Sequence, residues 1–379
     1  MQIITSRVGG GHLSVAQALA DAFRGPSPTP VDVWVDDLYV NLARFPASKF
    51  PSAYALMTRR FPRLWRAVFE RTNRPPGPKR LELLADPVGG PAAQALIERR
   101  RPHVVVSVLP GVNGFLARAI ARAGLPTRLE VVITDWADVH LGWVSAGVDH
   151  FCVPTEAAAR TCRVVGVTEW AIDVVGYPVR LPFTLATSRA EARQRLGLKP
   201  RGFLILTMAG TEGSARAVAH IESLLETRLD AEIAVLCGRN AGLKRRVEGL
   251  RASDPVRVLN FVEDTWDWMA AADLLITKPG GSTLAEAFAR ALPAILIDPL
   301  PGQEEGNVRY TVSRGAAELA TSPSHLATLA RELRWAEPRR RLIAQRAAAL
   351  SRPDAANRAA LGILRRAAEV ELSAEAAAE

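Results

Sequence analysis

The sequence predicts an α/β protein made of two doubly wound, Rossmann-like domains that face each other across a cleft. Three observations predict this fold class. Short apolar runs alternate with helical stretches, glycine-rich turns follow the first such run in each half, and a turn-rich stretch at residues 174–183 separates the halves. Strands that are apolar on both faces and separated by helices are typical of parallel sheets.

The first half opens with an apolar run, a glycine turn and a helical pattern. We expect strands at residues 3–6, 31–35, 104–108 and 129–134, and helices at residues 13–23, 92–101 and 116–123. The strands are short aliphatic runs, whereas the helices show apolar residues at helical spacing.

The second half repeats this alternation of strands and helices and ends in a helical segment. We expect strands at residues 203–209, 233–237, 256–261, 274–277 and 294–299, a helix at 218–226, and an Ala- and Arg-rich helix over 354–379. A boundary near residues 177–182 divides the chain into domains 1–178 and 179–379, and the last helix can also pack back on the first domain.

Length, composition and charge limit the class of protein. The chain of 379 residues is long enough for two domains, and 48% apolar with 23% charged residues suits a folded globular protein. The net charge is +9, and residues 40–80 hold ten basic residues against one acidic residue, Glu70. Because the excess forms one patch, it favours a polyanionic partner: nucleic acid, anionic lipid or a phosphorylated substrate.

Cysteine usage and hydropathy indicate a compartment. The three cysteines, Cys152, Cys162 and Cys237, lack CxxC spacing and fit a reducing cytoplasm better than a disulfide framework. The sequence has no apolar run of about 18 to 20 residues. Its first residues lack the layout of a signal peptide. We therefore expect a cytoplasmic protein that would lie on a membrane surface.

The basic segment also carries aromatic residues at helical spacing. Tyr54 and Phe61 belong to one such set, and Trp65 and Phe69 belong to the next, with arginines between them. An apolar face beside cations is typical of a helix at a lipid interface, where each cation adds about 1 kcal/mol. The alternative is an ordinary packed pair of helices with a solvated basic face.

The first glycine turn brings a histidine to the start of a helix. Gly10, Gly11 and His12 follow the first expected strand. Glycines permit a tight turn and close approach to a ligand, and an imidazole can serve as a general base at neutral pH. Asp135, after a later strand, is a second candidate base or an orienting partner. A capping or core histidine and an N-cap aspartate are the alternatives.

The second half holds the more specific motifs. Small residues at a helix start suit a phosphate group, and nearby carboxylates and amides suit ribose and sugar hydroxyls. These candidates are Lys278, Gly280, Gly281, Ser282, Thr283, Glu286, Gln303, Glu304 and Asn307. A third glycine turn contributes Gly210, Thr211, Glu212 and Gly213. A solvated acidic loop is the alternative for residues 303–307.

Several stretches together resemble glycosyltransferase family 28, which has the GT-B fold. The branch most similar contains monogalactosyldiacylglycerol synthases and processive diacylglycerol glucosyltransferases. The resemblance runs from about residue 3 to 315, and its carrying stretches are VGGGHLSVAQAL, VVITDWADVHLGWVSAGVDHFCVPTEAA, VVGYPVRLPF, CGRNAGLKRRV and ITKPGGSTLAEAFARALPAILIDPLPGQEEGN.

The resemblance implies roles for the residues that match. The second domain would hold a UDP-sugar, with the glycine turn facing the diphosphate, Glu286 at the ribose, Gln303 and Glu304 at the sugar, and Arg239, Phe261 and Val262 around the uracil. His12 would activate the acceptor, and Gly10, Gly11 and Asn113 would lie on the acceptor side. Such enzymes are inverting and need no metal or other cofactor besides the sugar nucleotide. Arg7 and Leu109 depart from the pattern of relatives, so the acceptor can differ.

These inferences predict a UDP-hexose transferase that acts on a lipid such as diacylglycerol at the cytoplasmic face of the cell membrane. The expected partners are the UDP-sugar, the lipid and the anionic surface, with no nucleic acid and no obligate protein partner. A UDP-sugar 2-epimerase, a transferase to another acceptor and a non-catalytic lipid or nucleic-acid binder are the alternatives.

Overall fold

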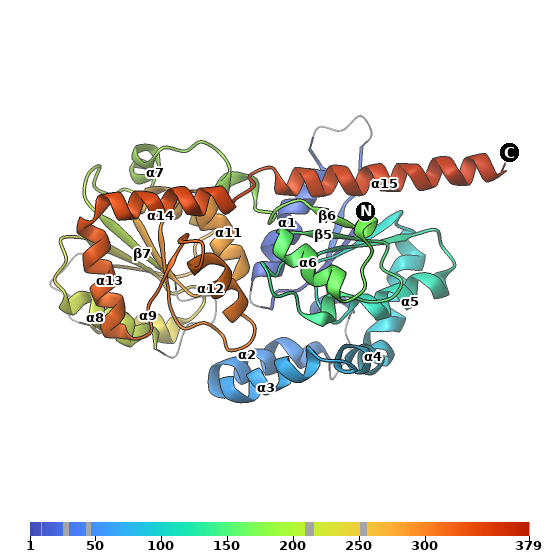
Figure 1. Cartoon of the computed structure of the whole chain (residues 1–379), viewed down its shortest axis with the longest axis horizontal. Coiled ribbons are helices and arrows are strands. Elements are labelled where there is room, and N and C mark those ends of the chain that lie inside the picture. Colours follow the sequence, from blue (N-terminus) through green and yellow to red (C-terminus); the bar gives the residue numbers. More distant parts are fainter. Residues whose placement is uncertain (9, 26–29, 43–46, 209–215, 251–255, 379) are drawn as a thin grey trace. The chain divides into compact units, whose positions relative to one another are not determined.

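The computed structural model describes residues 1–8, 10–25, 30–42, 47–208, 216–250 and 256–378. The chain forms two compact units, Met1–Arg180 together with Arg352–Glu379, and Leu181–Ser351 (Figure 1). The first change of unit falls within the expected boundary region of residues 177–182. The segment that begins at Arg352 belongs to the first unit, so the chain passes through the second unit and returns.

The first unit contains a six-stranded sheet whose neighbouring strands are all parallel. Across the sheet the order is β2 (Trp34–Asp37), β1 (Gln2–Thr5), β3 (Val104–Ser107), β4 (Arg128–Val132), β5 (His150–Val153) and β6 (Ile172–Val174). β2 begins three residues after the expected start at residue 31. β5 and β6 were not expected from the sequence. Because the strands run the same way, their carboxyl ends share one edge.

The helices of the first unit are α1 (Gly11–Phe23), α2 (Phe50–Arg60), α3 (Pro62–Thr72), α4 (Gly77–Arg100), α5 (Asn113–Ala123), α6 (Glu156–Val164) and α15 (Ala355–Ala378). α4 packs against α5, and α15 packs against α1 (Figure 1). α4 is longer than the helix expected at residues 92–101, because it continues through Pro87 and Pro91. α2 and α3 pack against each other and carry much of the basic segment.

The second unit has the same architecture. Its parallel sheet has the order β12 (Glu318–Leu319), β11 (Ala294–Leu296), β10 (Leu274–Thr277), β7 (Leu204–Met208), β8 (Glu232–Leu236) and β9 (Val256–Leu259). Its helices are α7 (Arg189–Arg195), α8 (Ala217–Glu226), α9 (Ala241–Glu248), α10 (Thr265–Ala271), α11 (Gly281–Ala289), α12 (Glu305–Val312), α13 (Pro323–Trp335) and α14 (Glu337–Leu350).

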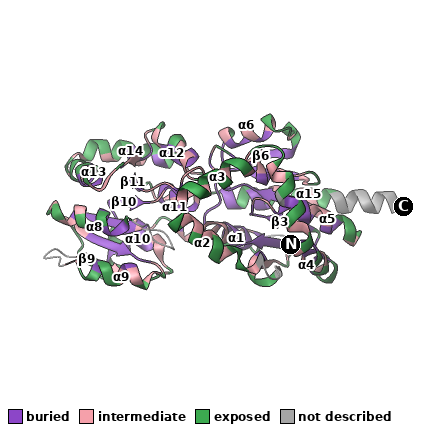
Figure 2. Ribbon diagram, turned by 90° about the horizontal axis from the view of Figure 1, so that it is seen from below, coloured by how far each residue is buried: buried purple, intermediate pink, exposed green. Residues whose placement is uncertain are grey.

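The core of each unit lies between its sheet and the covering helices, as the buried strands in Figure 2 show. In the second unit, Ile205 and Ile276 from the sheet share one apolar cluster with Ile221 of α8 and Leu326 of α13. Burying each such side chain contributes about 1.5 to 3 kcal/mol before conformational entropy is counted. These cores give rigid supports for the loops at the carboxyl edges of the two sheets.

Candidate functional site

His12 lies at the carboxyl edge of the first sheet, in the first turn of α1. Gly10, which precedes the helix, has φ of 75°, a left-handed conformation that glycine adopts at little cost. The helix is held by its buried face, which includes Val15 and Leu19. The glycine turn therefore places the imidazole at the edge where parallel sheets bind ligands.

The surroundings of His12 keep its ring neutral. Its Nδ1 lies 3.5 Å from the hydroxyl of Thr134, and its ring centroid lies 6.1 Å from that of Trp143. Burial lowers the pKa of His12 to about 4, although a hydrogen bond with the backbone of Val108 acts in the opposite direction. A neutral imidazole at pH 7 can accept a proton from a hydroxyl group.

Asp135 organises the loop that follows β4. Its Oδ2 accepts hydrogen bonds from the backbone N–H of His140, at 3.1 Å, and from the indole N–H of Trp143, at 2.8 Å. Burial raises the pKa of Asp135 to about 6, and these two hydrogen bonds oppose that shift. The hydrogen bonds described for this carboxylate thus run to the loop rather than to His12.

The loop of residues 138–143, called the acceptor loop below after the expected acceptor side, is also held by the segment after β3. The N–H of Gly111 donates to the carbonyl of Gly142 at 2.6 Å. The buried Asn113 donates from its side-chain amide to the carbonyl of Trp143 at 2.8 Å. Asn113, expected on the acceptor side, therefore supports the loop through its amide nitrogen.

The aromatic residues of α2 and α3 form a row inside the helical pair. Tyr54 meets Trp65 edge to face at 5.0 Å, and Trp65 is followed by Phe69 at 6.4 Å. These three side chains are partly buried, whereas Phe61 is 56% exposed. Of the four residues expected at a membrane, Phe61 thus faces solvent and the others pack within the pair.

A different apolar face of α3 is open to solvent. Phe61, Leu64 and Val68 are 56%, 55% and 37% exposed, and their spacing places them on one side of the helix. Arg63, Arg66 and Arg71 are exposed on the same helix, and Arg66 pairs with Glu70 one turn along. The helix therefore presents an apolar strip and, elsewhere on its surface, exposed cations.

The C-terminal end of α3 contacts the acceptor loop, which the sequence did not reveal. Nε2 of His140 lies 3.2 Å from the hydroxyl of Thr72 and 3.4 Å from the carbonyl of Phe69. The side-chain oxygen of Asn73 accepts from the N–H of Leu141 at 2.7 Å. No spacing rule connects residues separated by almost 70 positions, so the sequence carries no local signal for this contact.

In the second unit, the expected donor residues follow neighbouring strands at one carboxyl edge. Phe261 and Val262 follow β9, Arg239 follows β8, Lys278 follows β10, and Gln303 follows β11. Gly210, Thr211, Glu212 and Gly213 lie outside the described residues. The strand order therefore gathers motifs that are far apart in sequence along a single edge.

The glycine turn after β10 leads directly into α11. Gly280 caps this helix, so Gly281, Ser282 and Thr283 form its first turn. The first turn of a helix directs its N–H groups outwards and carries a partial positive charge. Glu286 lies in the next turn and is 7% exposed. The arrangement is suited to a phosphate group with a hydroxyl-bearing group beside it.

Asn307 connects the two expected donor loops, and Glu304 is hydrogen-bonded within one of them. Asn307 donates from its side-chain amide to the carbonyl of Pro279 at 2.9 Å, so α12 is tied to the glycine turn. Glu304 accepts from the N–H of Leu300 at 2.7 Å, and burial raises its pKa while nearby Lys278 lowers it. Gln303 is exposed at the same edge.

Arg239 and Phe261 form a platform at the β8 and β9 side. The guanidinium lies 4.8 Å from the centre of the Phe261 ring, and Phe261 is 48% exposed. A planar cation over an aromatic ring offers a flat surface on which a base can stack.

The sequence also carried no signal for a contact between two side chains, one on α8 and one just after β11. Nδ1 of His220 lies 3.6 Å from Oδ2 of Asp298, whose φ of 44° is unusual for a residue other than glycine. α8 follows the third glycine turn, and Asp298 precedes the loop that carries Gln303. The pair thus connects α8, which follows one expected donor segment, with the residues that precede another.

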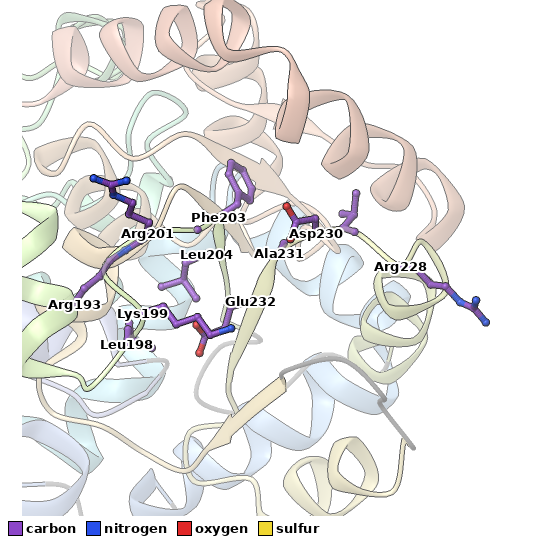
Figure 3. Close-up of a pocket in the computed structure, with 12 residues that line it drawn as sticks. Arg193, Leu198, Lys199, Arg201, Phe203, Leu204, Arg228, Asp230, Ala231 and Glu232 are labelled. Carbon is purple, nitrogen blue, oxygen red and sulfur yellow. The ribbon is translucent and has the colours of Figure 1, made fainter.

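A hollow of about 310 Å³ in the second unit lies at the opposite edge of the sheet (Figure 3). Its lining residues Phe203 and Glu232 stand at the amino ends of β7 and β8. Because the donor motifs follow the carboxyl ends of the strands, this hollow is separate from them.

Two kinds of feature are absent from the described residues. Over those ranges, no group of three or more His, Cys, Asp and Glu side chains is arranged to hold a metal ion. None of the helices described is both long enough and apolar enough to cross a membrane.

Comparison with known families covers most of the chain. Residues 12–179 match the monogalactosyldiacylglycerol (MGDG) synthase family, and residues 204–358 match the glycosyltransferase family 28 C-terminal domain. Monogalactosyldiacylglycerol synthase 2 of Arabidopsis thaliana is 31% identical over 345 residues, covering 87% of this chain and 72% of the relative. The chloroplast enzyme of Spinacia oleracea is 29% identical over 367 residues, covering 93% and 70%.

Solved structures agree on the fold. MurG of Acinetobacter baumannii is 15% identical with a TM-score of 0.59, covering 96% of this chain and 99% of its own. Anabaena Alr3699/HepE, solved with UDP-glucose, is 13% identical with a TM-score of 0.58, covering 96% and 99%. The chain therefore belongs to the monogalactosyldiacylglycerol synthase family of GT-B glycosyltransferases and is a UDP-sugar glycosyltransferase.

Proposed function

We propose that this member of the monogalactosyldiacylglycerol synthase family transfers a hexose from a UDP-sugar to the hydroxyl of a membrane lipid such as diacylglycerol. The observation that carries the proposal is the second unit's carboxyl edge, where α11, Glu286, Glu304 and the Arg239–Phe261 platform follow neighbouring strands. Relatives named for the synthesis of a galactolipid, and a GT-B protein solved with UDP-glucose, support the lipid and the donor.

On the donor side, each part of the sugar nucleotide has a suitable group. The diphosphate lies at the first turn of α11, where the N–H groups of Gly281 and Ser282 and the cation of Lys278 attract its charge. Glu286 accepts from the ribose hydroxyls, and Gln303 and Glu304 bind the hexose. The uracil stacks at the platform of Arg239 and Phe261, beside Val262.

On the acceptor side, His12 is the general base. As the lipid hydroxyl forms its bond to the anomeric carbon, its proton passes to the neutral imidazole, and the bond to the diphosphate oxygen breaks on the opposite face. Configuration at the anomeric carbon is inverted by this single displacement. The charge that develops on UDP is stabilised by Lys278 and α11, so the reaction needs no metal or other cofactor.

The lipid arrives from an anionic membrane surface on which the protein is peripherally bound, at the cytoplasmic face of the cell membrane. The exposed strip of Phe61, Leu64 and Val68 provides apolar burial, and the exposed arginines of the same helix provide attraction to anionic headgroups. No nucleic acid and no obligate protein partner is needed for this activity.

The test is release of UDP from a panel of UDP-hexoses in the presence of vesicles that contain diacylglycerol and phosphatidylglycerol. We expect lipid-dependent turnover in the wild type and a loss of roughly 10²- to 10⁴-fold in His12→Ala. Glu286→Gln should raise the dissociation constant for UDP-sugar about tenfold, because an amide binds a ribose diol less strongly than a carboxylate.

Two matched variants control for general damage. His325→Ala and Glu248→Gln change the same residue types at exposed positions on α13 and α9, outside the expected sites, and both should behave like the wild type. UDP binding without lipid turnover would contradict the lipid acceptor. Interconversion of free UDP-sugars without any transfer would identify a 2-epimerase instead.

A further inference from the structure

The acceptor loop is attached on three sides. Asp135 holds it from β4, and Gly111 and Asn113 hold it from the segment after β3. The third attachment comes from α3, through Phe69, Thr72 and Asn73. The first two belong to the edge of the sheet, whereas the third belongs to the helix with the exposed apolar strip.

We propose that His140 and Asn73 are positioning residues that tie the acceptor loop to α3, so that seating α3 on a lipid surface sets the loop for transfer. This inference rests on the proposed function, since it assigns to the membrane-facing helix a role in catalysis besides attachment. The loop carries Trp143, which lies beside His12, and it is bonded to Asp135.

The hydrogen bonds of His140 define its tautomer. Nδ1 accepts from the N–H of Gly142 at 3.0 Å, so the ring proton is carried by Nε2. Nε2–H then faces the hydroxyl of Thr72 and the carbonyl of Phe69. Burial lowers the pKa of His140, which favours this neutral form. One ring therefore caps the turn Leu141–Trp143 with one nitrogen and binds α3 with the other.

Asn73 supplies a second tie next to the first. It ends α3, with its N–H bonded to the carbonyl of Phe69 at 2.9 Å. Its side-chain oxygen accepts from the N–H of Leu141 at 2.7 Å, in the turn that His140 caps. Two adjacent residues of the loop are thus bonded to the last turn of α3.

The contact extends through packed rings to the other helix of the pair. Phe69 lies 4.7 Å from the ring of His140, Trp65 lies next to Phe69, and Tyr54 of α2 meets Trp65. Close-packed aromatic rings resist small displacements, so a shift of the pair is transmitted to the loop. The exposed Leu64 and Val68 lie on the same helix as these rings, on a face that lipid can cover.

Separate substitutions can cut the ties and leave the loop intact. In His140→Asn, the shorter side chain keeps an oxygen near the position of Nδ1 to accept from Gly142, but it cannot reach α3. Asn73→Ala removes the acceptor for Leu141, and Asn73→Asp restores it as the rescue variant. Urea unfolding midpoints equal to that of the wild type establish that each variant is folded.

The first measurement is turnover on diacylglycerol-containing vesicles of phosphatidylcholine and phosphatidylglycerol. We expect kcat to fall roughly 10- to 100-fold in His140→Asn and Asn73→Ala, because misplacing catalytic groups by about 1 Å has effects of this size. Cosedimentation with the vesicles and UDP affinity should stay at wild-type values, and Asn73→Asp should recover most of kcat. Unchanged kcat, or a loss of cosedimentation that parallels the loss of turnover, would overturn the proposal.

The second measurement does not depend on turnover. In the wild type, vesicles should slow hydrogen exchange at the Leu141 amide about fivefold or more, and in Asn73→Ala this slowing should be absent. If the wild type transfers no hexose yet shows the slowing, the proposed function fails and the tie to α3 stands. If vesicles bind and the Leu141 amide exchanges at an unchanged rate, the tie is refuted whatever the activity.

Discussion

At the scale of single residues, the lowered pKa of His12 has a consequence for stability. Burial lowers its pKa to about 4, against 6.5 for an unperturbed histidine. Between these values the unfolded chain binds a proton that the folded chain does not, so stability declines as pH falls from 6.5 towards 4. The full difference is up to about 3 kcal/mol.

We therefore expect His12→Gln to flatten the pH dependence of unfolding. Urea midpoints at pH 7.5 and pH 4.5 should differ less in the variant than in the wild type. Because burial also lowers the pKa of His140, some dependence should persist in His12→Gln. Equal slopes for the two proteins would show that His12 is as readily protonated in the folded state as in the unfolded state.

We expect substitutions of the two candidate bases, His12 and Asp135, to lower lipid turnover by different factors. Oδ2 of Asp135 accepts two N–H groups, and the oxygen of an asparagine can still accept from them. Asp135→Asn should therefore lower lipid turnover by about tenfold at most, far less than His12→Ala. The measurement is kcat/KM with saturating UDP-sugar. A loss in Asp135→Asn as large as that in His12→Ala would make Asp135 the base.

Substitution of Asn307 tests whether its hydrogen bond to Pro279 keeps the glycine turn after β10 in the shape that binds UDP. Its amide donates to the carbonyl of Pro279, and aspartate has nearly the same shape but no N–H to donate. Asn307→Asp should raise the dissociation constant for UDP roughly 10-fold, since a buried carbonyl loses its donor next to a carboxylate. Calorimetric titration with UDP measures this directly. An affinity equal to that of the wild type would mean that the turn keeps its shape without Asn307.

Residue types next to strand ends could be predicted from sequence, but their partners could not. The glycine turns, His12 and Glu286 follow apolar runs, so their place at a carboxyl edge is expected from the fold class. His140 contacts α3, and His220 contacts Asp298, only because the sheet brings distant segments together. Such pairs have no spacing signature.

At the scale of elements, we predict that the exposed apolar face of α3 contributes to membrane binding. Leu64 and Val68 are 55% and 37% exposed, and replacing both by glutamate adds negative charge to an exposed apolar strip. Cosedimentation of Leu64→Glu/Val68→Glu with phosphatidylglycerol vesicles should fall about tenfold or more, with UDP affinity unchanged.

Leu342→Glu on α14 is the matched control, since Leu342 is 44% exposed and belongs to the second unit. It should bind vesicles as the wild type does. If the control loses vesicle binding to the same extent as the double variant, the α3 strip has no special role in attachment.

The aromatic spacing predicted helices in the basic segment but not which side of each helix would face outwards. Tyr54 of α2 packs against Trp65 of α3, Trp65 lies next to Phe69 on the same helix, and Phe61 is left exposed. β5 and β6 were missed because each is a short run that contains a polar residue, His150 or Asp173. Short strands leave little periodicity to detect.

At the scale of the whole molecule, length and alternation predicted two α/β units, but the place of the last helix depends on a charge cluster. Arg366 of α15 binds both oxygens of Glu130, at 3.0 and 2.8 Å, and reaches Asp173 at 2.7 Å. Glu130 lies within β4 and is fully buried. Its partner stands 236 positions later, which no local pattern of sequence could reveal.

From this cluster we predict that a single substitution of Arg366 lowers the free energy of unfolding. Arg366→Met removes the cation that is hydrogen-bonded to the buried Glu130 carboxylate and leaves it with Arg128, whose Nε lies 3.6 Å away, so we expect a loss of about 3 kcal/mol of unfolding free energy. Because both partners belong to the first unit, hydrogen exchange should accelerate there and stay unchanged in Leu181–Ser351. Arg358→Met on the same helix removes an exposed pair with Asp354 and should cost at most about 0.5 kcal/mol. Adding Glu130→Leu to Arg366→Met should recover much of the loss, since the buried charge that lost its hydrogen-bonded partner is then gone. Equal losses in Arg366→Met and Arg358→Met would show that α15 is held by apolar packing alone.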